Sequence, residues 1–251
     1  MDPHLWQYPA LAIVGFVSGF LNILAGGGSL LTLPLLIFLG LPATVANATN
    51  RVGVLCQNVV AIGAFRRKGV LPMKLALLCT APSLLGSYLG ARLAVDIDER
   101  LFQRLLAAIM IGVLLVIVLD PAKRLQGKEA HFTPLRLAVL LVSFFFIGIY
   151  GGFVQAGVGF LIIPALLVHG FDLVRTNAVK IFVILAFTVP ALAVFIWHGQ
   201  VDWLLGFILA AGNASGGWVA SHVAVRKGHD WIKRVVSATV LVLALKLLFW
   251  P

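Results

Sequence analysis

Two short polar segments interrupt an otherwise apolar sequence, and each one combines a side-chain amide with a cation. They lie at residues 47–51 and 176–180. An arginine presents a planar fork that fits an oxyanion, whereas a lysine presents a compact point charge. Both segments lie near the expected start of an apolar helix, where free backbone N–H groups and the helix dipole also favour an anion. We therefore predict a site for a small anion that includes Asn47, Thr49, Asn50, Arg51, Thr176, Asn177 and Lys180.

The two cations have a second interpretation. Arg51 and Lys180 could instead fix the orientation of their helices, or extend so that each charge reaches a membrane surface. We favour a binding site because charged side chains inside membrane segments are costly and usually face a transport pathway. Both cations also follow a glycine-rich segment at a similar distance along the chain.

The distribution of acidic residues indicates the charge of the substrate. All of them lie in or beside the expected loops: Asp2, Asp96, Asp98, Glu99, Asp120, Glu129, Asp172, Asp202 and Asp230. A cation pathway or a carboxylate proton relay would normally place an acid inside an apolar segment. The interior polar groups are amides and cations, which suit an anion. An inside-negative potential favours outward movement of an anion by about 2.3 kcal/mol per charge per 100 mV, so a coupling ion is not required.

The sequence around these residues is duplicated. Residues recur 130 positions later without a gap, for example Phe16 as Phe146, Gly27 as Gly157, Pro34 as Pro164, Asn47 as Asn177 and Arg104 as Arg234. Duplicated halves are typical of secondary transporters, whose substrate binds where the halves meet. We predict a first membrane repeat at 1–125 and a second at 126–251, which together form one transport domain. Arg51 and Lys180 are expected to face one cavity at their interface.

The composition is that of a membrane protein. Hydrophobic residues make up 61% of the chain and charged residues 11%, and the mean hydropathy is +1.05. A soluble domain carries about 25% charged residues, so this chain could not cover its surface in water. The first apolar segment belongs to the repeat and is therefore not expected to be a cleaved signal peptide. No cofactor, metal ion or enzymatic activity is expected.

Turn-forming residues divide each half into five apolar segments. We predict them at 6–25, 29–40, 45–65, 72–94 and 101–119, and at 135–155, 159–169, 173–197, 201–224 and 231–250. The second segment of each half is unusually short, because as a straight helix its residues extend only about 18 Å across a core of about 30 Å. The predicted fold is an all-α polytopic membrane protein. It has two inverted repeats of about five segments each, with eight long helices and two short half-helices or re-entrant arms.

A glycine-rich break precedes each short segment. Irregular backbone at membrane depth is tolerated only where it is buried in protein or lines a cavity. We therefore add the residues of both breaks to the predicted substrate site: Gly26, Gly27, Gly28, Ser29, Gln155, Gly157 and Gly159. Other glycines, spaced four residues apart, are expected only to bring helices close together. These are Gly86, Gly90, Gly212 and Gly216.

Basic residues cluster in loops that alternate with loops nearly free of them. Twelve of the 19 Lys and Arg residues lie at 66–74, 123–136 and 226–234. Such loops face the cytoplasm. Loop 66–74 is then cytoplasmic, whereas its repeat equivalent near 196–204 contains no Lys or Arg and is expected outside. The two halves are therefore expected to be inverted. Each half crosses an odd number of times, five if the short segments cross and three if they turn back. Both termini are expected to lie outside the inner membrane. The net charge of +10 reflects orientation and contacts with lipid phosphates, and nucleic-acid binding is not expected.

The sequence resembles the sulfite exporter TauE/SafE family. The resemblance covers about residues 9–250 and is carried by the length, the duplication and the paired glycine and polar segments. The family pattern of a small residue, Thr-Asn and a basic residue matches 48–51, whereas 176–180 departs from the usual Gly-Thr-Ser of the second half. The resemblance implies a secondary transporter, often an exporter, of sulfite, organosulfonates or other small anions. The partners considered are this anion, membrane lipid and a second copy of the chain in a homodimer.

Three other functions are consistent with parts of the sequence. A passive anion channel could use the same broken helices and basic residues, and only flux kinetics would separate it from a carrier. An intramembrane hydrolase could use Ser29 with His222, but the second half has Gly159 in place of the serine and no acid is available to orient the histidine. A retinal protein could use Lys246, but no apolar segment supplies a counterion.

Overall fold

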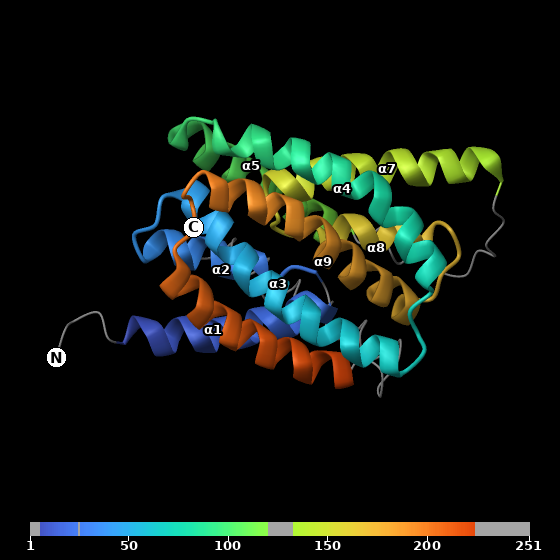
Figure 1. Cartoon of the computed structure of the whole chain (residues 1–251), viewed down its shortest axis with the longest axis horizontal. Coiled ribbons are helices and arrows are strands. Elements are labelled where there is room, and N and C mark those ends of the chain that lie inside the picture. The colour runs from blue at the N-terminus through green and yellow to red at the C-terminus, as the bar shows by residue number, and fades with distance from the viewer. Residues whose placement is uncertain (1–5, 25, 120–132, 224–251) are drawn as a thin grey trace.

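The described part of the chain is helical. The computed structural model describes residues 6–24, 26–119 and 133–223, and every regular element in these ranges is an α-helix (Figure 1). The helices are α1 (Gln7–Leu24), α2 (Ser29–Phe38), α3 (Ala43–Arg67), α4 (Met73–Val95), α5 (Glu99–Leu119), α7 (Pro134–Phe153), α8 (Gly159–Leu167), α9 (Leu173–Trp197) and Trp203–Val223. Four of them are long and apolar enough to cross a membrane, namely α1, α7, α9 and Trp203–Val223. The predicted all-α polytopic fold is confirmed, and the segment predicted at 231–250 lies outside the described residues.

Each short helix turns back along the helix before it. Gly28 at the start of α2 packs against Asn22 near the end of α1, while Phe38 at the end of α2 borders Ile13 of α1. In the second half, Nε2 of His169, just after α8, lies 3.2 Å from a backbone carbonyl oxygen in the first turn of α7. The short segments are therefore re-entrant arms, which settles the choice that the sequence left open.

The turns at the tips of these hairpins depend on glycine. Gly26 has a φ angle of +86° and Gly157 one of +67°, in a region that residues with a β-carbon rarely adopt. Because α2 turns back, α3, α4 and α5 remain as the long helices that follow the hairpin of the first half. Counted as one crossing each, they give the odd number of crossings that inversion of the next half requires.

Equivalent helices of the two halves run in opposite directions. The carboxylate of Glu99 accepts a hydrogen bond of 2.5 Å from the N–H of Ala43, so α3 and α5 start on the same side. Asp202, just beyond α9, donates its N–H to Oγ1 of Thr49 (3.0 Å) near the start of α3. Thus α9 ends where its equivalent α3 begins, which confirms the inversion. We call the side on which α3 starts the Glu99 side and the side on which it ends the Lys68 side.

The fourth helix of each half packs against the first helix of the other half. Figure 1 shows α4 along α7 at the top, and Trp203–Val223, in orange-red, along α1 at the bottom. Glycines make both contacts close. A β-carbon on any of them would lie well inside 3.0 Å of a carbonyl oxygen of the facing helix, as holds for Gly86, Gly90, Gly212 and Gly216. Their predicted packing role is confirmed, and each half contributes helices to two mixed bundles.

Enlarging one of these glycines is expected to destabilise the fold. In Gly90→Val the side chain would overlap the carbonyl oxygen of Ile149, so α4 and α7 would have to separate. We expect a loss of about 3 kcal/mol in the free energy of unfolding, at the upper end for overpacking, measured by thermal or denaturant unfolding in detergent. Gly112→Val is the matched control, because a β-carbon there meets nothing within 4 Å. Equal losses in the two variants would contradict the close packing of α4 on α7.

Candidate substrate site

The tips of the two re-entrant hairpins meet in the middle of the protein. A β-carbon added to Gly26 would overlap the Cα atom of Gly159, and the converse also holds. A β-carbon on Gly27 would lie 2.6 Å from the ring of Phe160, in the opposite hairpin. One on Gly157 would lie 2.6 Å from Cγ1 of Val113. Both breaks therefore lack room for a side chain, and they contact each other across the boundary between the halves.

Arg51 is fully buried and holds the end of a helix from the other half. Its Nη1 donates to the carbonyl oxygen of Gly151 (2.8 Å) and its Nη2 to that of Gly152 (2.6 Å), in the last turn of α7. The guanidinium carbon also lies 4.9 Å from the centre of the Phe195 ring. The last carbonyl groups of a helix lack partners within it and carry its negative dipole end, so a cation there is stabilised.

Lys180 makes the reciprocal contact. It is also fully buried, and its Nζ donates to the carbonyl oxygens of Asn22 (3.1 Å) and Ile23 (2.9 Å) in the last turn of α1. Each cation thus caps the first helix of the opposite repeat, just before the hairpin tip. The two cations are not repeat equivalents, because Arg51 corresponds to Ile181 and Lys180 to Asn50. Each nevertheless reaches carbonyl groups in the last turn of the first helix of the other half.

Two asparagines at equivalent repeat positions, Asn47 and Asn177, complete the same arrangement. Nδ2 of Asn47 donates to the carbonyl oxygen of Phe153 (2.9 Å), and Nδ2 of Asn177 donates to that of Leu24 (3.4 Å). An amide and a cation from one repeat therefore bind the end of the first helix of the other repeat, in both directions. The structure places Arg51 beside Asn47 and Lys180 beside Asn177 at the interface between the halves, with neither cation directed toward a membrane surface.

Several buried oxygen atoms around this interface have no hydrogen-bond partner. They are Oδ1 of Asn47, Oδ1 of Asn177 and Oε1 of Gln155, whose side chains are at most 2% exposed. The amide orientations are set by their other atoms; Nε2 of Gln155, for example, donates to Oγ1 of Thr188 (2.6 Å). Buried polar atoms usually have a partner. These oxygens can accept hydrogen bonds from a bound ligand, and Nε of Arg51 is a buried donor that also lacks a partner.

The remaining predicted residues divide into separate groups. Nδ2 of Asn50 donates to Oγ of Ser29 (3.0 Å), which links α3 to the start of α2. Thr49 is bonded to the backbone of Asp202 on the Glu99 side, so its hydroxyl does not join Asn47 and Arg51. Oγ1 of Thr176 is buried without a partner. Because Ser29 is bonded to Asn50, and His222 contacts the carbonyl oxygen of Trp218, the serine and histidine of the hydrolase alternative have separate partners.

Two kinds of functional group were missed from the sequence. The backbone carbonyls that bind Arg51 and Lys180 carry no side-chain signal, so only the tertiary fold identifies them. Thr188, which orients Gln155, could have been found. It is the repeat equivalent of Asn58, and a polar residue at the same place in two apolar helices is a signal of its own.

The match to known sequences covers nearly all of this structure. The sequence model of the family described as "Sulfite exporter TauE/SafE" matches residues 11–247, which include both hairpin tips and both polar segments. The chain belongs to the TauE/SafE family. The predicted resemblance is thereby confirmed, and the protein is a multi-pass membrane protein of a transporter family.

Curated relatives of this TauE/SafE chain carry names of the same kind. A "Probable membrane transporter protein ORF9" of Sinorhizobium sp is 28% identical over 99% of this chain and 94% of its own length. A "Probable membrane transporter protein" of Haemophilus influenzae is 26% identical over 99% and 97%. "Probable membrane transporter protein YfcA" of Escherichia coli is 27% identical over 95% and 88%. No solved structure matches the chain.

Proposed function

We propose that the protein is a secondary transporter, operating as an exporter, of small anions such as sulfite or organosulfonates. The observation that carries the proposal is the reciprocal contact of two fully buried cations with helix ends of opposite repeats. No carboxylate among the described residues lies inside the helices next to them. An anion is therefore the natural additional partner for Arg51 and Lys180. Family membership and the names of the relatives support transport, without specifying the ion.

Alternating access follows from competition for the two cations. An anion that enters between the hairpin tips draws Arg51 or Lys180 away from the carbonyl oxygens of the opposite helix, because a charged acceptor forms the stronger hydrogen bond. The released helix end can then move with its hairpin. Since the arrangement is repeated in inverted orientation, the same change at the second cation opens the site toward the other side.

The unpartnered oxygens favour an anion that also carries a hydrogen-bond donor. Asn47, Asn177 and Gln155 each present a buried acceptor, which a purely acceptor ligand such as sulfate would leave unsatisfied. Leaving such a group unpaired costs about 1–3 kcal/mol. We therefore expect 2-aminoethanesulfonate or 2-hydroxyethanesulfonate to bind more tightly than ethanesulfonate, by about tenfold.

A ligand screen tests this proposal. Detergent-purified protein would be heated with sulfite, sulfate, the three sulfonates and simple carboxylates. A ligand present at 100 times its Kd should stabilise the fold by about 2.7 kcal/mol. Stabilisation by none of these anions would refute the proposed substrate class. Saturable flux with trans-stimulation in liposomes identifies a carrier, whereas single-channel current steps would establish the alternative, a passive anion channel.

The orientation in the membrane is part of the proposal. Exposed cations lie on the Lys68 side at Arg66, Arg67, Lys68 and Lys74. Clusters of this kind support a cytoplasmic location for that side in a protein of the inner membrane. The start of α1 lies on the Glu99 side, which supports an external location for the chain that precedes this helix. The predicted external carboxyl terminus lies outside the described residues.

Two repeat-equivalent positions test this orientation. In a background without Cys56 and Cys79, His198→Cys is expected to react with a membrane-impermeant maleimide on intact cells, because it lies on the Glu99 side. Lys68→Cys, 130 positions earlier, should react only after the membrane is permeabilised. The measurement is the labelled fraction of each purified variant. Labelling of both variants on intact cells, or of Lys68→Cys alone, would contradict the proposed orientation.

A further inference from the structure

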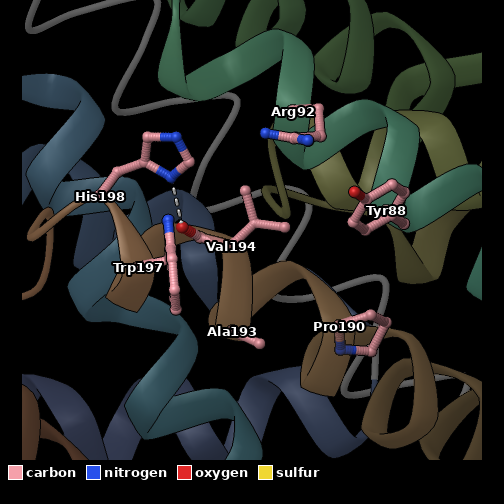
Figure 2. A pocket seen from close by; sticks show the side chains of 7 residues that line it. All are labelled: Tyr88, Arg92, Pro190, Ala193, Val194, Trp197 and His198. Atoms are coloured by element: carbon pink, nitrogen blue, oxygen red, sulfur yellow. Dashed lines mark hydrogen bonds between the residues drawn. The ribbon is translucent and has the colours of Figure 1, made fainter.

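A groove on the Glu99 side lies between the last turns of α4 and α9. Figure 2 shows its lining: Tyr88 and Arg92 from α4 face Pro190, Ala193, Val194 and Trp197 from α9, with His198 at the end. The volume is about 450 Å³. The wall formed by α9 is mainly apolar, whereas the charged side chain, Arg92, and the aromatic side chains, Tyr88 and Trp197, lie at the rim.

The groove opens to the surface that faces lipid. Large apolar side chains are exposed on the two helices that form it: Leu85, Leu89 and Leu93 on α4, and Val189 and Ile196 on α9. Trp197 is 87% exposed at the end of α9. Exposed leucines on a membrane helix contact acyl chains, and tryptophan and tyrosine concentrate at the level of the headgroups. This position favours a membrane lipid over a water-soluble substrate as the occupant, with the rim at the level of the headgroups.

Arg92 supplies a charge for a phosphate at that level. Its guanidinium carbon lies 5.6 Å from the centre of the Tyr88 ring, which holds the side chain across the rim. Among the described residues, no carboxylate forms an ion pair with Arg92. The ring of His198 is fixed by a contact of 2.7 Å between Nδ1 and the carbonyl oxygen of Val194 (Figure 2). A planar guanidinium that lacks an acidic partner suits a phosphate group.

We propose that this groove binds one membrane phospholipid, with the headgroup phosphate at Arg92 and an acyl chain along Pro190, Ala193 and Val194. The apolar wall accounts for the acyl chain, and the rim of Tyr88, Arg92 and Trp197 accounts for the glycerol and phosphate region. The occupant is an intact anionic glycerophospholipid, because free phosphate would leave the apolar wall uncovered.

The repeat preserves the same combination on the opposite surface. Trp218 and His222 are the equivalents of Tyr88 and Arg92, and their rings lie 4.5 Å apart. Arg67 and Lys68 are the equivalents of Trp197 and His198, and both are exposed. The fourth helix of each half, α4 or Trp203–Val223, thus carries an aromatic residue followed one turn later by an arginine or a histidine. The two pairs lie at opposite membrane surfaces. Duplication has kept the chemistry of a headgroup contact although every side chain has changed.

Native mass spectrometry of the full chain in detergent tests the proposal, with phosphatidylglycerol as the probe. Wild-type protein is expected to bind one phosphatidylglycerol molecule more tightly than any further ones. Arg92→Gln should raise the dissociation constant of this first lipid-binding step about tenfold, because it removes a charged hydrogen bond. Arg100→Gln is the matched control, since Arg100 is an exposed arginine on the same side but outside the groove. It should leave the step unchanged.

A second variant tests the groove without changing the charge. Ala193 is exposed in the wall, so Ala193→Trp should fill the space and weaken the same step while the protein remains folded. Equal weakening by Arg92→Gln and Arg100→Gln would overturn the proposal, because the attraction would then depend only on total charge. Retention of the lipid by both Arg92→Gln and Ala193→Trp would also overturn it. So would displacement of the lipid by millimolar inorganic phosphate, which would identify an ion site.

Discussion

Arg51→Gln is expected to lower the affinity for the transported anion by one to two decades and to lower the melting temperature as well. The variant removes the charge proposed to bind the anion, and a charged hydrogen bond contributes about 1.5–3 kcal/mol. It also removes the donors to the carbonyl oxygens of Gly151 and Gly152, which are inside the protein. Both effects are measured in one experiment, as the melting temperature of purified protein with and without the anion.

Three variants separate these effects. Arg66→Gln removes an exposed charge from the end of the same helix and should change neither the melting temperature nor the affinity. Arg51→Lys keeps the charge without the fork, so an intermediate defect is expected. Lys180→Gln should reproduce the loss at the reciprocal contact. Unchanged anion binding by the Arg51→Gln, Lys180→Gln double variant would show that the two cations only cap helices, and the proposed binding role would then be wrong.

The second large effect is expected at the contact between the hairpin tips. Gly159→Ala should abolish transport, because the new methyl group would overlap Cα of Gly26 and separate the tips of the two arms. Gly159 begins α8 and has no positive φ angle. Alanine is therefore acceptable to the local backbone, and the loss can be assigned to the contact with the other half. The measurement is anion flux into liposomes containing purified protein.

Gly63→Ala is the control for this substitution. Gly63 lies within α3, and an added β-carbon meets nothing within 4 Å, so the exchange should be neutral or stabilising by about 0.5–1 kcal/mol. Gly26→Ala should fail for two reasons, the same overlap and a φ angle of +86°. Normal flux through Gly159→Ala would show that the hairpin tips can separate without loss of function, contrary to the proposed mechanism.

Much of the fold could be predicted because membrane insertion acts on local sequence. Apolar length, basic loops and the repeat at 130 residues gave the helices and their inversion. The segment predicted at 173–197 coincides with α9 (Leu173–Trp197), and the other segments that fall within the described residues differ from the helices by a few residues at their ends. Whether the short segments cross was undecidable, since a ten-residue apolar helix has the same composition in either case. That choice depends on Gly28 and Phe38 packing along α1.

The candidate site could be predicted only in part. Arg51, Lys180, Asn47 and Asn177 were identified because polar residues are rare in apolar helices, and the structure places all four at the boundary between the halves. Their partners could not be identified, because every helix ends in free carbonyl groups and the sequence does not show which helix end each side chain reaches. The contact of Gly26 with Gly159 was also hidden. These residues are not equivalent in the repeat, so no comparison of the halves pairs them.

The exchange of fourth helices sets an order for assembly during synthesis. α4 leaves the ribosome before α7, and α1 must wait for Trp203–Val223, which is synthesised after every other described helix. At about 5–20 residues per second, α1 is made on the order of ten seconds or more before its partner. Until then the small-residue faces of α1 and α4 have only lipid or the insertion machinery to contact. A nascent chain released after α5 would contain every helix of one repeat and neither of the close helix pairs.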